Sequence, residues 1–306
     1  MISLFKKKVL VVTHSGSFHA DDIFAMAVLI LYFEQENIAW KLVRTRDEAI
    51  IQKADYVFDV GGIYDPSKRR FDHHQPGGAG KRENKIPYAA FGLVWKEYGP
   101  KIVKKEQIVQ DIDKRIVQAI DAVDNGVSIT KESDYGIYDY GIHGIVSAYQ
   151  NSWKNPLDDT RRYNNFLKLA YFFAETLKND IERTKDRFEL LELIEEAYQK
   201  SEHKEIIEVP YHIGISEMVQ ALHKYPEVLY VIAKSNDKWK VMAMRKVPYS
   251  FENRKSFPKE WAGKRGKELQ KVTGVSDAVF CHDERWLVVT ETKQGAWKIA
   301  ELALID

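Results

Sequence analysis

Aspartate and histidine residues gather in four short segments of the sequence. Carboxylate oxygens and neutral imidazoles, with no thiolate beside them, are ligands for Mn²⁺, Mg²⁺, Fe²⁺ or Zn²⁺. Their number exceeds the need of one ion, so two divalent cations are implied. Two ions about 3.5–4 Å apart that share a carboxylate and an acidic bridging water form an arrangement that hydrolyses phosphate esters. The residues are His14, His19 and Asp21, then Asp59, then Asp72, His73 and His74, and finally Asp124.

Each of these residues also has an ordinary structural interpretation. A single histidine in a strand or loop usually satisfies hydrogen bonds. Asp59 and Asp124 could form a turn or cap a helix. The joint occurrence with the other histidines and aspartates, at the ends of predicted elements, favours a metal site.

The elements that must position these residues follow a repeating pattern. Residues 8–13 form a β-branched run typical of a strand buried on both faces, and an apolar helix follows from Asp21 and Asp22 to about Phe33. Strands at 40–44 and 56–60, with a short helix at 47–53, complete a βαβαβ pattern and predict a mostly parallel sheet. Ligands in such sheets gather at the carboxyl ends of the strands. The strands end in His14, in Asp59 and, after a further short strand, in Asp72.

The remaining sequence predicts further helices and a second α/β region. Helices are expected at 88–103 and 111–122, the latter closing at the Asp124-Asn-Gly turn, and a long charged helix at 158–200 that links two halves. We therefore predict an α/β protein with a doubly wound N-terminal domain at 1–157, a helical connector at 158–203 and a smaller α/β domain at 204–306. In that last part strands are expected at 206–209, 228–233, 239–244, 278–280 and 286–289, and helices at 264–272 and 295–304.

Length and composition set wider limits. A chain of 306 residues exceeds the usual size of one core, which favours two domains. A net charge of +1 restricts any phosphate-binding surface to a local patch. The single cysteine, Cys281, excludes an internal disulfide and fits a reducing compartment. The apolar run after three N-terminal lysines resembles a first strand rather than a signal peptide, and no run approaches the roughly 20 apolar residues of a membrane span. We expect a cytoplasmic protein without a membrane partner; the oligomeric state cannot be deduced.

Four motifs in order carry a resemblance to a known family. THSGSFHADD, FDVGG, RFDHHQ and DAVDNG resemble the motifs of the DHH phosphoesterase superfamily, and the form of the first motif is similar to that of the Myg-type exonuclease family within it. The resemblance continues through Trp153-Lys-Asn-Pro, Trp261-Ala-Gly-Lys-Arg and Phe280-Cys-His282. It therefore covers nearly the whole chain.

The resemblance implies two domains, an active site in the cleft between them, and two divalent cations, usually Mn²⁺. Each cation has its own set of ligands, and Asp59 belongs to both sets. Asp72 would orient a ligand histidine, and His74 would face the substrate phosphate. By the resemblance, His14, His19 and Asp59 hold the first ion, and Asp21, Asp59, His73 and Asp124 hold the second.

The resemblance also implies the activity. Myg-type members are 3′→5′ exoribonucleases, so the expected function is metal-dependent removal of nucleoside monophosphates from single-stranded RNA, or from DNA, by attack of a bridging hydroxide. A phosphodiesterase for short oligonucleotides or cyclic dinucleotides would use the same site. A non-catalytic RNA-binding protein that has kept the ligands is the third interpretation.

Two departures from the superfamily pattern concern the metal and the substrate. His19 stands where many members have an aspartate, so a neutral ligand replaces an anionic one, and the preferred metal is left open. The Gly-rich C-terminal loop of many members is also missing, with Thr292-Lys-Gln-Gly295 in its place. The choice between RNA, DNA and dinucleotides therefore stays open.

Basic residues near these motifs could contact phosphate, although charged runs are often simply solvated. One set surrounds the Pro-Gly-rich segment 76–80 and could form a flap: Arg69, Arg70, Lys81, Arg82 and Lys85. The second set surrounds Trp261, which is either a base-stacking or a core residue: Arg254, Lys255, Lys259, Lys264, Arg265 and Lys267. His282, by the resemblance, is the best single candidate for a substrate contact from the C-terminal domain. The other expected substrate-binding residues are Arg265 and Lys264 of that domain and Arg70 near the metal motifs.

Overall fold

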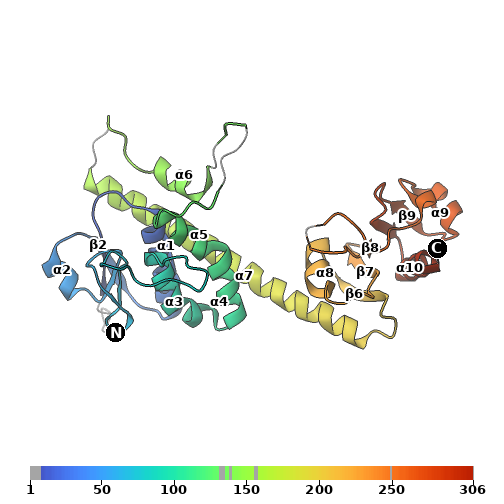
Figure 1. Ribbon diagram of the computed structural model, residues 1–306, viewed down its shortest axis with the longest axis horizontal. Coiled ribbons are helices and arrows are strands. Elements are labelled where there is room, and N and C mark those ends of the chain that lie inside the picture. Colours follow the sequence, from blue (N-terminus) through green and yellow to red (C-terminus); the bar gives the residue numbers. More distant parts are fainter. Residues whose placement is uncertain (1–7, 131–134, 138–139, 155–157, 249, 306) are drawn as a thin grey trace, which may run out of the picture. The chain divides into compact units, whose positions relative to one another are not determined.

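The computed structural model describes residues 8–130, 135–137, 140–154, 158–248 and 250–305. The N-terminal lysines Lys6 and Lys7, and Asn155 and Pro156 of one quoted motif, lie outside the described residues. Two compact units divide the chain, Met1–Thr184 and Lys185–Asp306, and the division falls within the long helix α7 (Asp159–Lys200) (Figure 1). Among the described residues, no helix combines the length and apolar character needed to cross a membrane.

The first unit contains a five-stranded sheet in the order β2-β1-β3-β5-β4. The first four of these strands are parallel to their neighbours, and the edge strand β4 is antiparallel to β5. The predicted mostly parallel sheet is therefore present. The strands are β1 (Val9–Thr13), β2 (Trp40–Arg44), β3 (Tyr56–Phe58), β4 (Tyr64–Asp65) and β5 (Arg70–Phe71).

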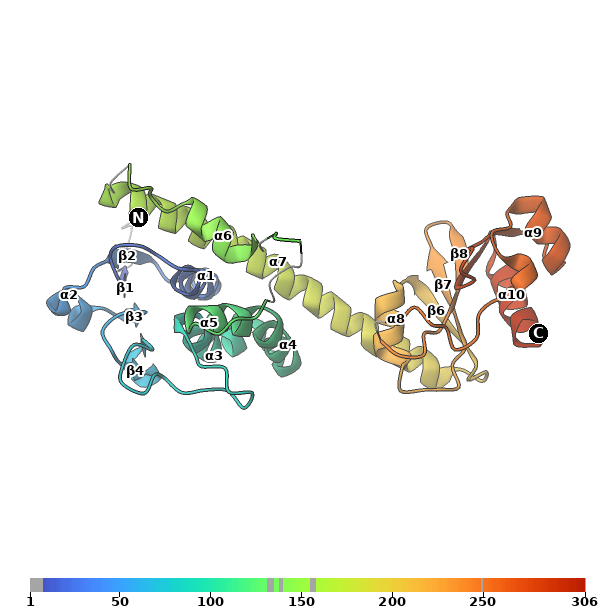
Figure 2. The ribbon, with the colours of Figure 1, turned by 45° about the horizontal axis from the view of Figure 1, so that its top comes forward.

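Helix α1 (Ala20–Gln35) is buried over most of its circumference because its sequence is apolar on almost every face. Phe24 packs against Phe91 of α3 (Ala90–Val103), with ring centroids 5.0 Å apart, and against Phe173 of α7 at 4.5 Å. A separate cluster forms where Ile51 of α2 (Glu48–Lys53) meets Val12 and Val57 of the sheet. Figure 2 shows α1, α3 and α5 grouped in this unit.

One helical stretch leads to the predicted ligand Asp124. It consists of α4 (Glu106–Ile112), a π-helical turn (Asp113–Val117) and α5 (Gln118–Asp124). The stretch begins five residues before the predicted start at 111 (111 minus 106) and ends at Asp124. The short helix α6 (Gly141–Ala148) was not predicted.

The second unit is built on a five-stranded sheet in the order β6-β7-β8-β10-β9. Only β6 and β7 pair in parallel, and the other neighbours are antiparallel. Helix α8 was not predicted, whereas each expected strand has a counterpart. The elements are β6 (Ile206–His212), α8 (Ile215–Leu222), β7 (Tyr230–Ser235), β8 (Lys238–Ala243), α9 (Gly266–Thr273), β9 (Ala278–Cys281), β10 (Leu287–Thr290) and α10 (Lys293–Ile305).

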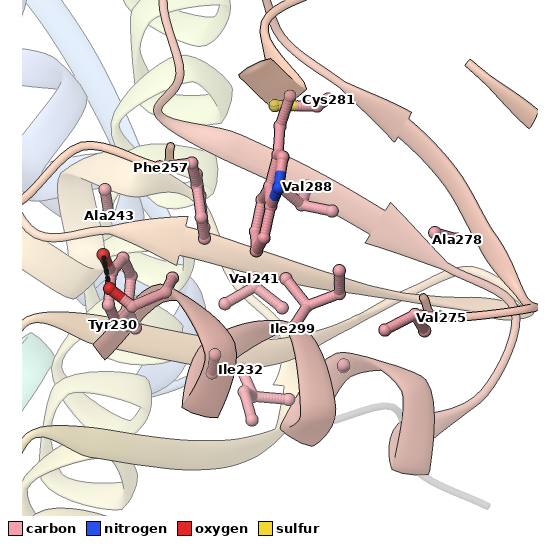
Figure 3. Close-up of a cluster of buried hydrophobic side chains, with 14 of the residues drawn as sticks. Tyr230, Ile232, Val241, Ala243, Phe257, Val275, Ala278, Cys281, Val288 and Ile299 are labelled. Atoms are coloured by element: carbon pink, nitrogen blue, oxygen red, sulfur yellow. Dashed lines mark hydrogen bonds between the residues drawn. The ribbon is translucent and has the colours of Figure 1, made fainter. Parts of the chain in front are cut away.

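Two apolar clusters cover the opposite faces of this second sheet. Figure 3 shows one of them, in which Val241 and Val288 of the sheet meet Ile299 of α10. Trp261 belongs to this cluster, is 4% exposed and stacks on Phe257. Trp261 is therefore a core residue, and the base-stacking interpretation of it is wrong. The cluster on the other face contains residues of α8 and of the end of α7.

Candidate metal centre

The ends of three adjacent parallel strands supply most of the candidate ligands. His14 follows β1, Asp59 follows β3, and Asp72 begins the segment after β5. Because β1, β3 and β5 are neighbours in the sheet and parallel, their carboxyl ends lie at one edge. Asp21 in the first turn of α1 and Asp124 at the end of α5 reach the same place.

The first group consists of His14, His19 and Asp59, whose ligand atoms lie within 4.8 Å of one another. The Nδ1–H of His14 donates to the carbonyl oxygen of Ser15 at 3.1 Å, so Nε2 is the atom left to bind a metal. That Nε2 lies 3.1 Å from Oδ2 of Asp59 and 3.0 Å from Oδ2 of Asp22. These three residues are the set that the sequence predicts for the first ion.

The second group surrounds the Nε2 atom of His73. It lies 3.3 Å from Oδ1 of Asp59, 3.3 Å from Oδ2 of Asp124 and 3.8 Å from Oδ2 of Asp21. The structure thus brings together the four residues that the sequence predicts for the second ion. Asp59 takes part in both groups, one oxygen toward each histidine.

Asp59 has an unusual backbone conformation for a residue other than glycine. Its φ is +55°, in the left-handed region, which aspartate tolerates better than most side chains. The carboxylate is 3% exposed and directed at His14 and His73. A strained residue at the centre of a cluster of ligands is common in functional sites.

Several polar atoms at this edge are buried and form no hydrogen bond of good geometry among the described residues, although some of them lie 3.3–3.8 Å from one another. They are both carboxylate oxygens of Asp21, Oδ1 of Asp59 and Nε2 of His73. A buried polar atom without a partner costs about 1–3 kcal/mol. Oxygen and imidazole donors left unpaired around one point are what divalent cations require, so the residues present fit two such ions.

The pKa shifts at this edge arise from burial and from the charges of neighbouring candidate ligands. Burial, together with the carboxylates of Asp59 and Asp124, raises the pKa of Asp21 well above its usual value. Burial opposes the charged form of His14, but hydrogen bonds with Asp22 and Asp59 outweigh it and raise the pKa of His14 to about 10. Burial also opposes the ionised form of Asp59, yet His14 and His73 hold the pKa of Asp59 below its usual range. The cluster therefore concentrates negative charge that cations would compensate.

Asp72 organises the Asp-His-His segment. Its Oδ1 accepts hydrogen bonds from the backbone N–H of His73 at 2.8 Å and from Nδ1 of His74 at 2.8 Å, and its Oδ2 accepts from the N–H of Gly62 at 2.5 Å. The ring that Asp72 orients is therefore that of His74 rather than that of His73. The side chain of His74 is 62% exposed, whereas that of His73 is 8% exposed.

Asp22 was missed as a neighbour of the site. The sequence assigns it to the favourable start of a helix, and its Oδ1 does accept the N–H of His19 at 2.9 Å. Its other oxygen lies beside Nε2 of His14. The sequence contained a signal for this contact, because an acidic residue at position N3 of a helix reaches back to the N-cap residue.

Two basic residues of the predicted flap have structural roles instead. The guanidinium of Arg70 donates to the carbonyl oxygens of Lys68 and Ala54, both at 2.9 Å. Ala54 precedes β3, so this guanidinium lies at the amino end of that strand, opposite the end occupied by Asp59. Placing Arg70 at the substrate phosphate was therefore wrong.

Arg82 is the second basic residue that leaves the predicted flap. Its side chain is 6% exposed and pairs with Asp113 and Asp121, each at 2.8 Å. Lys81 and Lys85 are exposed. The guanidinium of Arg69 lies 4.9 Å from the ring centroid of Tyr56, the first residue of β3, so it too lies near the amino end of that strand. A cationic flap is therefore reduced to these two lysines.

The predicted substrate residues of the second unit divide in a similar way. Arg265 is exposed and lies 4.5 Å from the ring centroid of Phe280, which in turn is 6.2 Å from the ring of His282. Lys264 is partly exposed. Arg254 donates to the carbonyl oxygen of Val228 at 2.9 Å and Lys255 to that of Leu304 at 2.8 Å, so these two residues hold the fold together.

Comparisons with known proteins cover nearly the full length of the chain. Residues 10–304 match the family model of the MYG1 exonucleases, described as Uncharacterised protein family (UPF0160). The MYG1 protein of Dictyostelium discoideum is 29% identical over 311 residues, covering 94% of this chain and 94% of that protein. The MYG1 exonuclease of Mus musculus is 28% identical over 327 residues, covering 95% and 84%. Among solved structures, RecJ from Thermus thermophilus in complex with Mn²⁺ aligns over 97% of this chain and about half (52%) of RecJ, with a TM-score of 0.29 and 11% identity.

Proposed function

This chain belongs to the MYG1 exonuclease family (UPF0160), and from that premise we propose that it is a metal-dependent 3′→5′ exonuclease. Its proposed substrate is single-stranded RNA, from which it releases nucleoside monophosphates, with single-stranded DNA as the alternative polymer. The name exonuclease carried by the mouse relative supports the nuclease class.

The observation that carries the proposal is the group of buried oxygen and nitrogen atoms, able to bind a metal, at the carboxyl edge of the first sheet. Asp21, Asp59 and His73 each leave at least one buried polar atom without a hydrogen bond of good geometry among the described residues. Such an arrangement destabilises the metal-free protein. A protein that only bound RNA would have no need of it.

We propose two overlapping sets of residues as the ligands of the two ions. Two divalent cations at these positions, Mn²⁺ first and Mg²⁺, Fe²⁺ or Zn²⁺ otherwise, would supply Lewis acidity and an acidified water for phosphodiester hydrolysis. The sets are His14, His19 and Asp59 for one ion and Asp21, Asp59, His73 and Asp124 for the other.

His74 is the residue proposed to contact the phosphate that is cleaved. Oδ1 of Asp72 accepts a hydrogen bond from Nδ1–H of His74, which leaves Nε2 of this exposed ring for the substrate. A donor held rigidly near a phosphate stabilises charge that develops on its oxygens. Asp72 would act through His74 and is a positioning residue in this proposal.

Residues of the second unit are proposed to hold the nucleic acid strand by stacking and charge. Arg265 lies over Phe280, and the rings of Phe280, His282 and Trp286 follow one another, with the His282 and Trp286 centroids 5.2 Å apart. Arg245 lies 5.8 Å from the Trp286 ring and continues the row. A row of rings with a guanidinium at each end suits single strands, because every base can stack whatever its identity.

The test is hydrolysis of an end-labelled single-stranded RNA ladder and a matched DNA ladder with added Mn²⁺, followed by sizing of the products. Stepwise loss of mononucleotides from the 3′ end, abolished by a chelator and by Asp59→Asn, is the expected result. Asparagine is chosen because it also tolerates positive φ, so the substitution should preserve the backbone conformation at position 59. Glu48→Gln, an exposed change in the same unit, should retain full activity.

Two outcomes would overturn the proposal. Cleavage of dinucleotides alone, with long strands intact, would assign the protein to small-substrate phosphodiesterases. Binding of RNA without Mn²⁺-dependent release of any mononucleotide would assign it to non-catalytic RNA-binding proteins.

A further inference from the structure

A pocket lies beside the candidate metal centre, at the same edge of the first sheet. Its volume is about 330 Å³. Its lining includes Ser15 and Gly16 from the loop after β1, Arg44 at the end of β2, and Thr160 and Arg162 from the first turn of α7. Because β2 is the neighbour of β1, the pocket extends the edge occupied by the candidate ligands by one strand.

The guanidinium of Arg44 is held firmly in this pocket. Its Nη2 donates to the carbonyl oxygen of Gly16 at 3.1 Å, and its Cζ lies 4.8 Å from the ring centroid of Phe166 and 5.4 Å from that of Phe18. Its Nε is buried and has no hydrogen-bond partner within the described part of the chain. A guanidinium held against two rings, with one N–H that makes no hydrogen bond, is prepared to bind an acceptor.

Arg162 presents the same feature from a different element. Its Nη1 pairs with Oδ1 of Asp159 at 3.1 Å, and the side chain of Asp159 is 92% exposed. The Nε of Arg162 is buried, and the described residues offer it no acceptor. Two guanidiniums from distant parts of the sequence therefore each keep a buried N–H unsatisfied in one pocket, which native proteins rarely do.

The charges around the pocket favour an anionic occupant. Burial lowers the pKa of Arg44, Asp22 and Asp159 oppose that shift, and the charge of Arg162 adds to it. Asp22 is fully buried and already lies beside His14, and Asp159 is almost fully in water. Neither carboxylate satisfies the two Nε atoms, so the repulsion between the guanidiniums is left for a ligand to relieve.

We propose that the Arg44–Arg162 pocket binds a phosphate of the nucleic acid strand next to the phosphate that is cleaved. This inference rests on the proposed nuclease function. Phosphate oxygens match the forked donors of arginine, and both arginines line this one pocket. Ser15 directly follows the candidate ligand His14, so one strand could lie across both sites along the sheet edge.

The first experiment compares a dinucleoside monophosphate with the same compound carrying one added terminal phosphate, on its 5′ or its 3′ end. The wild-type protein should hydrolyse one phosphate-bearing compound with a lower KM. In Arg44→Gln and Arg162→Gln that advantage should fall by about tenfold, the loss expected for one charge-assisted hydrogen bond. Turnover of the compound without the added phosphate should be unchanged.

Two further variants separate phosphate binding from folding. Arg161→Gln changes an exposed arginine adjacent to Arg162 that does not line the pocket, and it should behave as the wild type. Arg44→Lys keeps the charge but not the fork, and it should lose part of the advantage in a protein that stays folded at the assay temperature. Equal loss on both compounds in Arg44→Gln and Arg162→Gln would overturn the inference.

A binding measurement keeps the inference testable if no hydrolysis is found. With a chelator present, fluorescence anisotropy of a labelled single-stranded oligonucleotide is measured against salt. Arg44→Gln should reduce the slope of log K against log salt by about 0.7, the value for one phosphate on a single strand. Such a result without hydrolysis in the wild type would overturn the nuclease proposal and leave the pocket assignment standing.

Free phosphate is the other source of the same chemistry. Titration of the wild type and Arg44→Gln with inorganic phosphate, followed by isothermal calorimetry, distinguishes the two. Weak binding of phosphate alone, at millimolar concentration or above, together with an Arg44-dependent oligonucleotide affinity, is expected. Tight Arg44-dependent binding of inorganic phosphate, with oligonucleotide affinity equal in both proteins, would make the pocket a site for the free ion and overturn the inference.

Discussion

Asp21 carries the least favourable charge at the edge of the first sheet. It is fully buried, and Asp59 and Asp124 add their own negative charge to the same place. An acid whose pKa is raised on folding holds its proton more tightly in the folded state than in the unfolded state. Its contribution therefore lowers stability as the pH rises above about 3.8, the value that the unfolded chain approaches.

Asp21→Asn should stabilise the metal-free protein at neutral pH by about 1–3 kcal/mol, because it removes a buried unpaired charge. The gain should vanish toward pH 3, where Asp21 of the wild type is protonated. Thermal unfolding with a chelator present measures both effects, since about 1 kcal/mol shifts the melting temperature of a unit of this size by about 2–4 °C. Added Mn²⁺ should reverse the order of the two proteins, and a variant that is destabilised at pH 7 without metal would contradict the argument.

Asp72 offers a second prediction at the same scale. Asp72→Asn keeps one acceptor oxygen but introduces an amide N–H₂ that faces donors, so the ring of His74 loses its fixed orientation. Activity on single-stranded RNA should fall by about 10–100-fold, the usual effect of removing a group that orients a functional histidine. Bound metal, measured by mass spectrometry of the dialysed protein, should be unchanged because the ligand His73 touches Asp72 only through its backbone. A parallel loss of metal would assign Asp72 to the metal centre instead.

At the residue scale, the sequence predicted acidic and imidazole groups better than basic ones. His14, Asp59 and His73 are placed by strand ends, and strand ends are visible as the limits of β-branched runs. Arginine has a long side chain, so its position in the sequence says little about where the guanidinium lies. Arg70 therefore turned to the opposite end of β3, and Arg82 became buried. The pair Arg44 and Arg162 could not be found, because only the folded chain brings 44 and 162 together.

Among the elements, a buried ion pair joins α5 to the loop that precedes α3, close to a candidate ligand. Asp121 is fully buried, pairs with Arg82 and accepts the N–H of Gly92 in the first turn of α3 at 3.0 Å. Asp124 follows one turn later on the same helix. The loop that carries the Asp-His-His segment toward α3 is anchored at Arg82. The ion pair therefore holds Asp124 and this loop in fixed positions.

Arg82→Met should destabilise the first unit by about 3–5 kcal/mol, because it leaves the carboxylate of Asp121 buried without its cation. Adding Asp121→Asn should recover most of this loss, since the amide is neutral and its oxygen can still accept from Gly92. Urea unfolding of the single and double variants measures the recovery. If the double variant were no more stable than Arg82→Met, the ion pair would not be the source of the effect.

The elements that the sequence did not predict share one physical cause. Helices α6 and α8 have eight residues each, and a helix that short is stabilised by packing rather than by its own sequence. Met218, Val219, Ala221 and Leu222 of α8 pack in the cluster on one face of the second sheet. The π-helical turn at Asp113–Val117 likewise leaves no pattern in the sequence, although Asp113 within it pairs with Arg82. The long helices α1 and α7, with 16 and 42 residues, were predicted closely because a helical sequence of that length is recognisable by itself.

In the molecule as a whole, the candidate ligands and the two apolar clusters of the second sheet belong to different units. All of the predicted metal ligands lie within Met1–Thr184, whereas Val241, Ile299 and the rest of the second core lie within Lys185–Asp306. A ligand that binds only the folded form of one unit stabilises that unit alone. Metal binding should therefore act on one part of the unfolding process.

Differential scanning calorimetry of the full chain should resolve two unfolding transitions, and Mn²⁺ should raise only one of them. At a free concentration of 100 times Kd, one bound ion stabilises the folded unit by about 2.7 kcal/mol. Asp59→Asn should abolish the shift because Asp59 lies in both candidate ligand groups, and Glu48→Gln should preserve it. Val241→Ala, in the core of the second unit, should lower the transition that Mn²⁺ leaves unchanged, which assigns each transition to its unit. If Mn²⁺ moved both transitions equally, α7 would couple the two units into one cooperative structure, and the independence argued from their separate cores would be wrong.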